Sequence, residues 1–199
     1  MTMEPTQFPP AAPRKMLHQR SVRCDGYLRA DGQWEVEASL RDTKCIDFVQ
    51  ITRGPQKAGA AVHDMKLRVT VDDQLTITAI ESEMATTPML ACQDAREYLH
   101  ELIGVRFVSG WQKEARARIG HRHACTHLMD LLVPAATTFY QTMGWGKNPE
   151  GGGELDHVRA SGDRPGFLDR CYGWRTDGPG VSEHFPQFAD KSVDERSEP

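Results

Sequence analysis

The chain has 199 residues, of which 39% are hydrophobic and 26% charged, and its formal net charge is −4. This charge does not favour nucleic acid or an anionic membrane as a partner. The sequence contains no run of 18 apolar residues, so no membrane-spanning helix is expected. The first 20 residues lack the apolar segment of a signal peptide. Because the five cysteines are irregularly spaced, we expect reduced thiols in a cytoplasmic protein rather than a disulfide framework.

The first half of the chain predicts an antiparallel sheet. Residues 1–18 are rich in proline and are expected to form a flexible arm. Strands are expected over residues 22–29, 33–41, 45–51, 65–71 and 75–80, with a Gly/Pro/Lys loop over residues 54–59. From Trp34 to Leu40 apolar and polar residues alternate, which is the period of a half-buried strand. The turn Ala30-Asp31-Gly32 favours a hairpin between the first two strands.

The second half changes to helical spacing. Helices are expected over residues 91–103, 111–119 and 126–143, and Pro134 should kink the last one or open a turn. Strands followed by helices predict an α+β fold, with an antiparallel sheet of about four to five strands and about three helices. The expected organisation is a core domain over 19–143, a Gly/Pro-rich extension over 144–185 that docks on the core, and a disordered tail over 186–199.

Residues 120–130 hold the densest group of metal-binding residue types. One thiol, three imidazoles and a carboxylate lie there, directly before an apolar helical segment. His63, Cys92 and Cys125 all fall at expected element ends, where sites are commonly built. The alternatives are plain: each cysteine can be a small buried hydrophobe, and His63 and Asp64 can form a surface pair. Arg41, Asp42 and Lys44 are interpreted as a solvated, charged strand end.

Several motifs resemble the bacterial domain-of-unknown-function family 2889. The resemblance spans residues 20–185, and its motifs lie at residues 23–29, 31–36, 40–44, 59–65 and 124–132. They include Asp-Gly-Gln-Trp-Glu-Val in the expected hairpin and Ala-Cys-Thr-His-Leu-Met-Asp at the start of the third helix. The family resemblance implies no activity.

A second resemblance, to the U-type iron–sulfur cluster scaffolds, concerns three positions. Residues 59–67 are similar to the scaffold motif before a strand hairpin, and Cys92 and Cys125 take the places of the later cysteines. The first scaffold cysteine is replaced by His63, so a three-thiolate cradle is not reproduced. The resemblance implies an iron–sulfur-scaffold-like fold and a mixed pocket of His63, Cys92 and Cys125, with Asp64 beside it. Such a pocket would hold zinc or iron with one position open.

Two classes of function follow from this pocket. The first is a metal-dependent, zinc or iron, small-molecule enzyme of hydrolase or lyase type. In it Asp64 or His127 would act as general base or orient a metal ligand, and Lys44 would steady an anionic substrate. The second is a carrier or assembly protein for metal, sulfur or iron–sulfur units, without turnover. A purely structural zinc is a third alternative, and a homo-oligomer is compatible with the sequence.

Overall fold

The computed structural model describes residues 12–144 and 162–190. The chain divides into two compact units, with the boundary between Thr142 and Met143. Most of the expected N-terminal arm and the last nine residues of the expected tail lie outside the described residues. Each unit is therefore described by itself.

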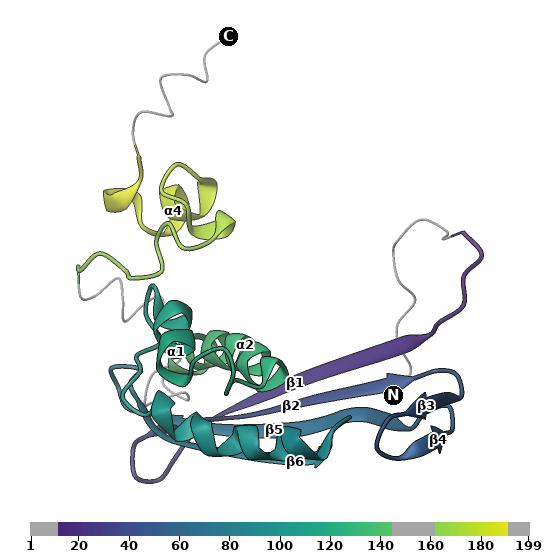
Figure 1. Cartoon of the computed structure of the whole chain (residues 1–199). Coiled ribbons are helices and arrows are strands. Elements are labelled where there is room, and N and C mark those ends of the chain that lie inside the picture. Colours follow the sequence, from purple (N-terminus) through teal and green to yellow (C-terminus); the bar gives the residue numbers. More distant parts are fainter. Residues whose placement is uncertain (1–11, 145–161, 191–199) are drawn as a thin grey trace. The chain divides into compact units, whose positions relative to one another are not determined.

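The first unit is an α+β domain built on a four-stranded antiparallel sheet, as the sequence predicts (Figure 1). Its strands, in spatial order, are β1 (His18–Leu28), β2 (Trp34–Lys44), β5 (Ala61–Val71) and β6 (Ile77–Thr86). The hairpin predicted between the first two strands is confirmed, and the strands expected over 65–71 and 75–80 also pair with each other. Each of the four strands is longer than its sequence pattern indicates.

The prediction that residues 45–51 continue this sheet is wrong. β3 (Phe48–Gln50) instead pairs with β4 (Gly54–Gln56) in a separate two-stranded sheet, and β4 occupies part of the predicted loop. Gly54 adopts a φ of 67°, which glycine tolerates and which lets the chain reverse over so few residues. The Thr52 hydroxyl also donates to the Pro88 carbonyl at 2.9 Å, which ties the small hairpin to the segment after β6.

Three helical segments follow the sheet in the first unit. They are η1 (Leu90–Leu102), α1 (Trp111–Ile119) and α2 (Thr126–Met143). The first is a 3₁₀ helix, which explains why Leu99 and Leu102, three residues apart, are buried while Ile103 is exposed. α2 continues past Pro134, so the proline opens no turn.

Helix α2 lies along β1 and β2 on one face of the sheet. The Thr138 side chain hydrogen-bonds the Cys24 thiol, and a Cβ atom on Gly26 would come within 1.9 Å of Thr142 Oγ1. Because Thr142 is one helical turn beyond Thr138, these contacts place the C-terminal end of α2 over Gly26. The N-terminal end of α2 therefore points toward the other end of β1, where the candidate site lies.

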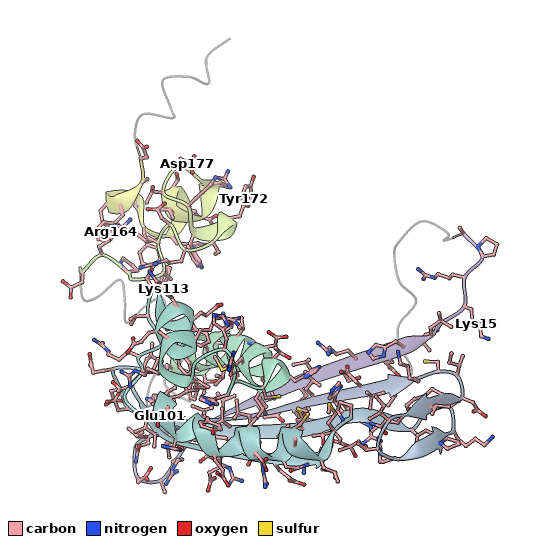
Figure 2. The ribbon with its side chains drawn as sticks, in the orientation of Figure 1. Lys15, Glu101, Lys113, Arg164, Tyr172 and Asp177 are labelled. Atoms are coloured by element: carbon pink, nitrogen blue, oxygen red, sulfur yellow. The ribbon has the colours of Figure 1, made fainter. Side chains whose placement is uncertain are left out.

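The second unit has a small core of its own in residues 162–190. Leu168, Val181 and Phe185 are buried together, and Phe167, Trp174 and Phe188 pack against them. The helical turns are η2 (Tyr172–Trp174), α4 (Pro179–His184) and η3 (Pro186–Phe188), and the exposed Tyr172 projects from the ribbon (Figure 2). Helical structure thus extends into the first residues of the tail predicted over 186–199. None of the described helices could cross a membrane, being too short or too polar.

Candidate active site

A buried carboxylate lies at the end of the alternating pattern in β2. The apolar alternation that starts at Trp34 and ends at Leu40 continues by parity to Asp42, which is only 1% exposed. In β5 the buried positions Leu67 and Met65 lead by the same parity to His63. Asp42 and His63 are partners in the β2–β5 register, so both side chains point to the face that α2 covers.

His127 reaches the same place from the start of α2. Its Nε2 atom lies 3.9 Å from Asp42 Oδ2, and its ring centroid lies 3.8 Å from that of His63. Each of Asp42, His63 and His127 offers a ligand-type atom, and these atoms all lie within 4.8 Å of one another. Two strands and a helix thus bring together residues that are up to 85 positions apart in the sequence.

Three side chains approach the Asp42 carboxylate, and two of them, Arg20 and His63, hydrogen-bond it. Arg20 donates from Nε to Oδ1 at 2.7 Å and from Nη2 to Oδ2 at 2.8 Å. His63 Nδ1 lies 3.0 Å from Oδ2, and His18 Nε2 lies 3.3 Å from Oδ1. We call these five residues, His18, Arg20, Asp42, His63 and His127, the Asp42 cluster.

The surroundings lower the pKa values of Asp42, His63 and His127. Hydrogen bonds and charge from Arg20, with a smaller contribution from His63, hold the pKa of Asp42 at about 2 against the opposing effect of burial. Burial lowers the pKa of His63, although Asp42 acts in the opposite direction. Burial, followed by the neighbouring His63, also lowers the pKa of His127. At neutral pH the cluster therefore holds an ionised Asp42 beside two neutral imidazoles.

The contact between Asp42 and His63 fixes the tautomer of the histidine. An ionised carboxylate can only accept hydrogen bonds, so the proton of the neutral His63 ring lies on Nδ1. Nε2 of His63 then keeps a free lone pair, and Asp42 stabilises the imidazolium that forms when Nε2 takes a proton. The arrangement can act as a general base.

The structure does not bring the three residues of the predicted pocket together. His63 and His127 meet, but among the described residues His63, Cys92 and Cys125 do not form a group with ligand atoms within 4.8 Å. Cys92 lies in the first turn of η1, and Cys125 directly precedes α2; both are half-buried free thiols.

The two other predicted catalytic residues also lie apart from the Asp42 carboxylate. Asp64 points to the opposite face of the sheet, where it forms an ion pair with Arg41. Lys44 ends β2 on the same face as Asp42 and is the register partner of His18, at the edge of the cluster.

Two hollows in the first unit share no residue with the cluster. One, of about 580 Å³, is lined by residues of α1 and the loop after it: Lys113, Arg116, Ala117, Gly120 and His121. The other, of about 500 Å³, lies over charged residues on the helix-free face of the sheet. The chemistry of the cluster, rather than either hollow, marks the candidate site.

Residues 18–141, more than half of the chain, match the family described as protein of unknown function (DUF2889). The chain belongs to this family, and the whole Asp42 cluster falls inside the matched segment. No curated protein and no solved structure matches the chain. The resemblance to iron–sulfur scaffolds therefore stays a prediction from the sequence.

Proposed function

We propose that the protein is a small-molecule enzyme of hydrolase or lyase type whose proton transfers occur at His63 and His127. One observation carries this proposal: the nearly inaccessible Asp42 carboxylate accepts the Nδ1 proton of His63 at 3.0 Å. Both reaction types need a group that removes a proton from water or from a substrate hydroxyl near neutral pH. An imidazole that is neutral, oriented and backed by a carboxylate is suited to that task.

The neighbouring imidazole has a complementary role in the proposal. His127 makes a ring contact with His63 and has no hydrogen bond to Asp42 within 3.5 Å. Its lowered pKa keeps it neutral, so it can carry a proton between the substrate and solvent. Lys44 and His18, which are register partners at the end of the strands, would hold an acidic group of the substrate.

A metal-dependent form of the same site is the second candidate. The close approach of the ligand atoms of Asp42, His63 and His127 favours it, because two imidazoles and a carboxylate are a common set for zinc and for ferrous iron. A bound metal would supply a water that ionises near neutral pH. Arg20 opposes this candidate, since its guanidinium occupies both carboxylate oxygens and repels a cation.

The carrier hypothesis has no comparable observation in its favour. It requires Cys92 and Cys125 as a pair of exchange thiolates beside His63, and the described residues form no such group. We therefore keep the enzyme as the conclusion.

A substrate panel tests the proposal. Wild-type protein is assayed against nitrophenyl esters, lactones and β-hydroxycarbonyl compounds, alongside His63→Gln, His127→Gln and the control His121→Gln, which lies outside the cluster. We expect turnover of at least one class, a loss of about 100-fold or more in kcat for His63→Gln, and wild-type rates for the control. Full activity in His63→Gln would contradict the proposal.

Chelation separates the two candidates. Activity that survives dialysis against a chelator supports the metal-free form. Activity that is lost on chelation and returns with zinc or ferrous iron assigns the metal-dependent form instead.

A further inference from the structure

The two edge strands of the main sheet differ in whether their outward-facing backbone groups are hydrogen-bonded. The outer side of β6 is partly covered, because the Ile77 N–H donates to the Val105 carbonyl, the Gly104 N–H donates to the Ile77 carbonyl, and the Gln93 side chain donates to the Met84 carbonyl. β1 is the opposite edge of the sheet, and within residues 12–144 and 162–190 no backbone hydrogen bond reaches its outer side. β1 has eleven residues and contains neither proline nor lysine, which proteins commonly use to protect such edges.

The pairing with β2 shows which peptide groups of β1 face outward. The Cys45 N–H donates to the Leu17 carbonyl and the Arg29 N–H donates to the Gln33 carbonyl. Both bonds belong to the register that runs without a shift along β1, so the odd-numbered residues bond to β2. The outward N–H and C=O groups therefore belong to the even-numbered residues of the strand: His18, Arg20, Val22, Cys24, Gly26 and Leu28.

We propose that β1 is an interaction surface for a second copy of this chain. The two β1 strands pair antiparallel about a twofold axis at Cys24, and the two sheets become one continuous eight-stranded sheet. Within each chain Arg23 Nε already donates to Asp25 Oδ2 at 2.8 Å. In this register Arg23 also faces the partner's Asp25 and Asp25 faces the partner's Arg23, so the two ion pairs lie side by side with opposite charges across the axis. Opposite charges placed directly across an antiparallel pair stabilise it, whereas an axis at Arg23 would set the two arginines against each other.

The exposed apolar side chains of β1 agree with this register. Val22 is 46% exposed and Tyr27 is 44% exposed. The register places Val22 beside the partner's Gly26 and Tyr27 beside the partner's Ser21, and the small Ser21 leaves room for the Tyr27 ring. This inference does not depend on the proposed function.

Proline at position 22 tests the hydrogen-bonded pairing. Val22→Pro removes an outward N–H from each copy and leaves the bonds to β2 in place, while the control Val22→Ala keeps the N–H. In sedimentation velocity at 1–100 µM, we expect wild type and Val22→Ala to be dimers. Two lost hydrogen bonds should weaken the Val22→Pro dimer about 30-fold. A monomeric wild type at 100 µM, or a Val22→Pro dimer as tight as wild type, would overturn the proposal.

A charge swap tests the register without disturbing the backbone. R23D and D25R each set like charges opposite each other twice, and we expect each variant alone to dimerise about tenfold more weakly than wild type. An equimolar mixture restores opposite charges across the axis and should form a heterodimer with wild-type affinity. If the mixture stays as weak as the separate variants, the register is wrong and the proposal fails.

Discussion

Neighbouring residues of the same two strands form two polar side-chain pairs with very different surroundings. Arg41 pairs with Asp64 on the helix-free face, where their side chains are 54% and 26% exposed. One residue along each strand, Asp42 meets His63 on the face that α2 covers, and Asp42 is almost inaccessible. A shift of one position thus separates a solvated pair of small energetic value from a buried pair that can orient an imidazole.

The largest expected difference between the faces is in stability. Asp42→Ala leaves Arg20 and His63 without their acceptor, and we expect it to lower the free energy of unfolding by about 3 kcal/mol. Asp64→Ala, its matched control on the other face, should cost about 0.5 kcal/mol or less. Urea denaturation of both variants measures the difference. Equal losses would show that the two pairs do not differ as described.

Low pH should lower the free energy of unfolding through the titratable residues on the face that α2 covers. The pKa of Asp42 is about 2 in the folded protein against an ordinary value of 3.8, so its contribution is present above pH 4 and is lost as the pH falls toward 2. The shift corresponds to about 2 kcal/mol. His63 and His127 also have lowered pKa values, so stability should begin to fall below pH 6.5, where the unfolded histidines take up protons.

Urea denaturation from pH 7 to pH 3 checks this dependence. A double variant, His63→Gln with His127→Gln, should lose the part of the slope that starts near pH 6.5. The control His121→Gln should keep it. An unchanged slope in the double variant would contradict the lowered histidine pKa values.

The close approach of α2 to the sheet can be tested at Gly26. A Cβ atom there would overlap Thr142 Oγ1, so Gly26→Ala should destabilise the protein by about 1–2 kcal/mol. Thr142→Ala removes the hydroxyl, and the double variant should lose less stability than the sum of the single variants. Strict additivity in thermal unfolding would mean that the two positions are not in contact.

The smallest effect is expected on the helix-free face. Arg68 donates to Glu37 and to Glu81 there, but all three side chains are exposed. Arg68→Ala should change the free energy of unfolding by about 0.5 kcal/mol, and 0.5 M salt should reduce the difference further. A loss comparable to that of Asp42→Ala would mean that exposure does not separate the two networks.

The sequence alone predicts the fold well where a hydrophobic pattern repeats over many residues. The alternation in the two hairpins and the helical spacing after residue 90 led to an α+β domain, which the structure confirms. The short hairpin of β3 and β4 was missed, because two strands of three residues leave no measurable period.

The candidate site is partly predictable from the sequence. The useful signal is the two-residue alternation of each strand, continued beyond its apolar residues. Continuing the alternation of β2 by two residues reaches Asp42, although its charged neighbours Arg41 and Lys44 favour the interpretation as a solvated strand end. Continuing that of β5 selects His63 and excludes its neighbour Asp64. How Arg20 and the start of α2 meet these residues depends on the docking of a helix on a sheet, which local patterns do not encode.

The protonation of the His63 ring nitrogens tests the central claim most directly. Nitrogen-15 NMR at pH 7, with His63→Gln and His127→Gln to assign the signals, reports which ring nitrogen carries hydrogen. We expect His63 to be neutral, with the proton on Nδ1 and a free Nε2, and its pKa to lie below 6.5. A proton on Nε2 of a neutral ring, or an imidazolium at pH 7, would contradict the account of the Asp42 cluster.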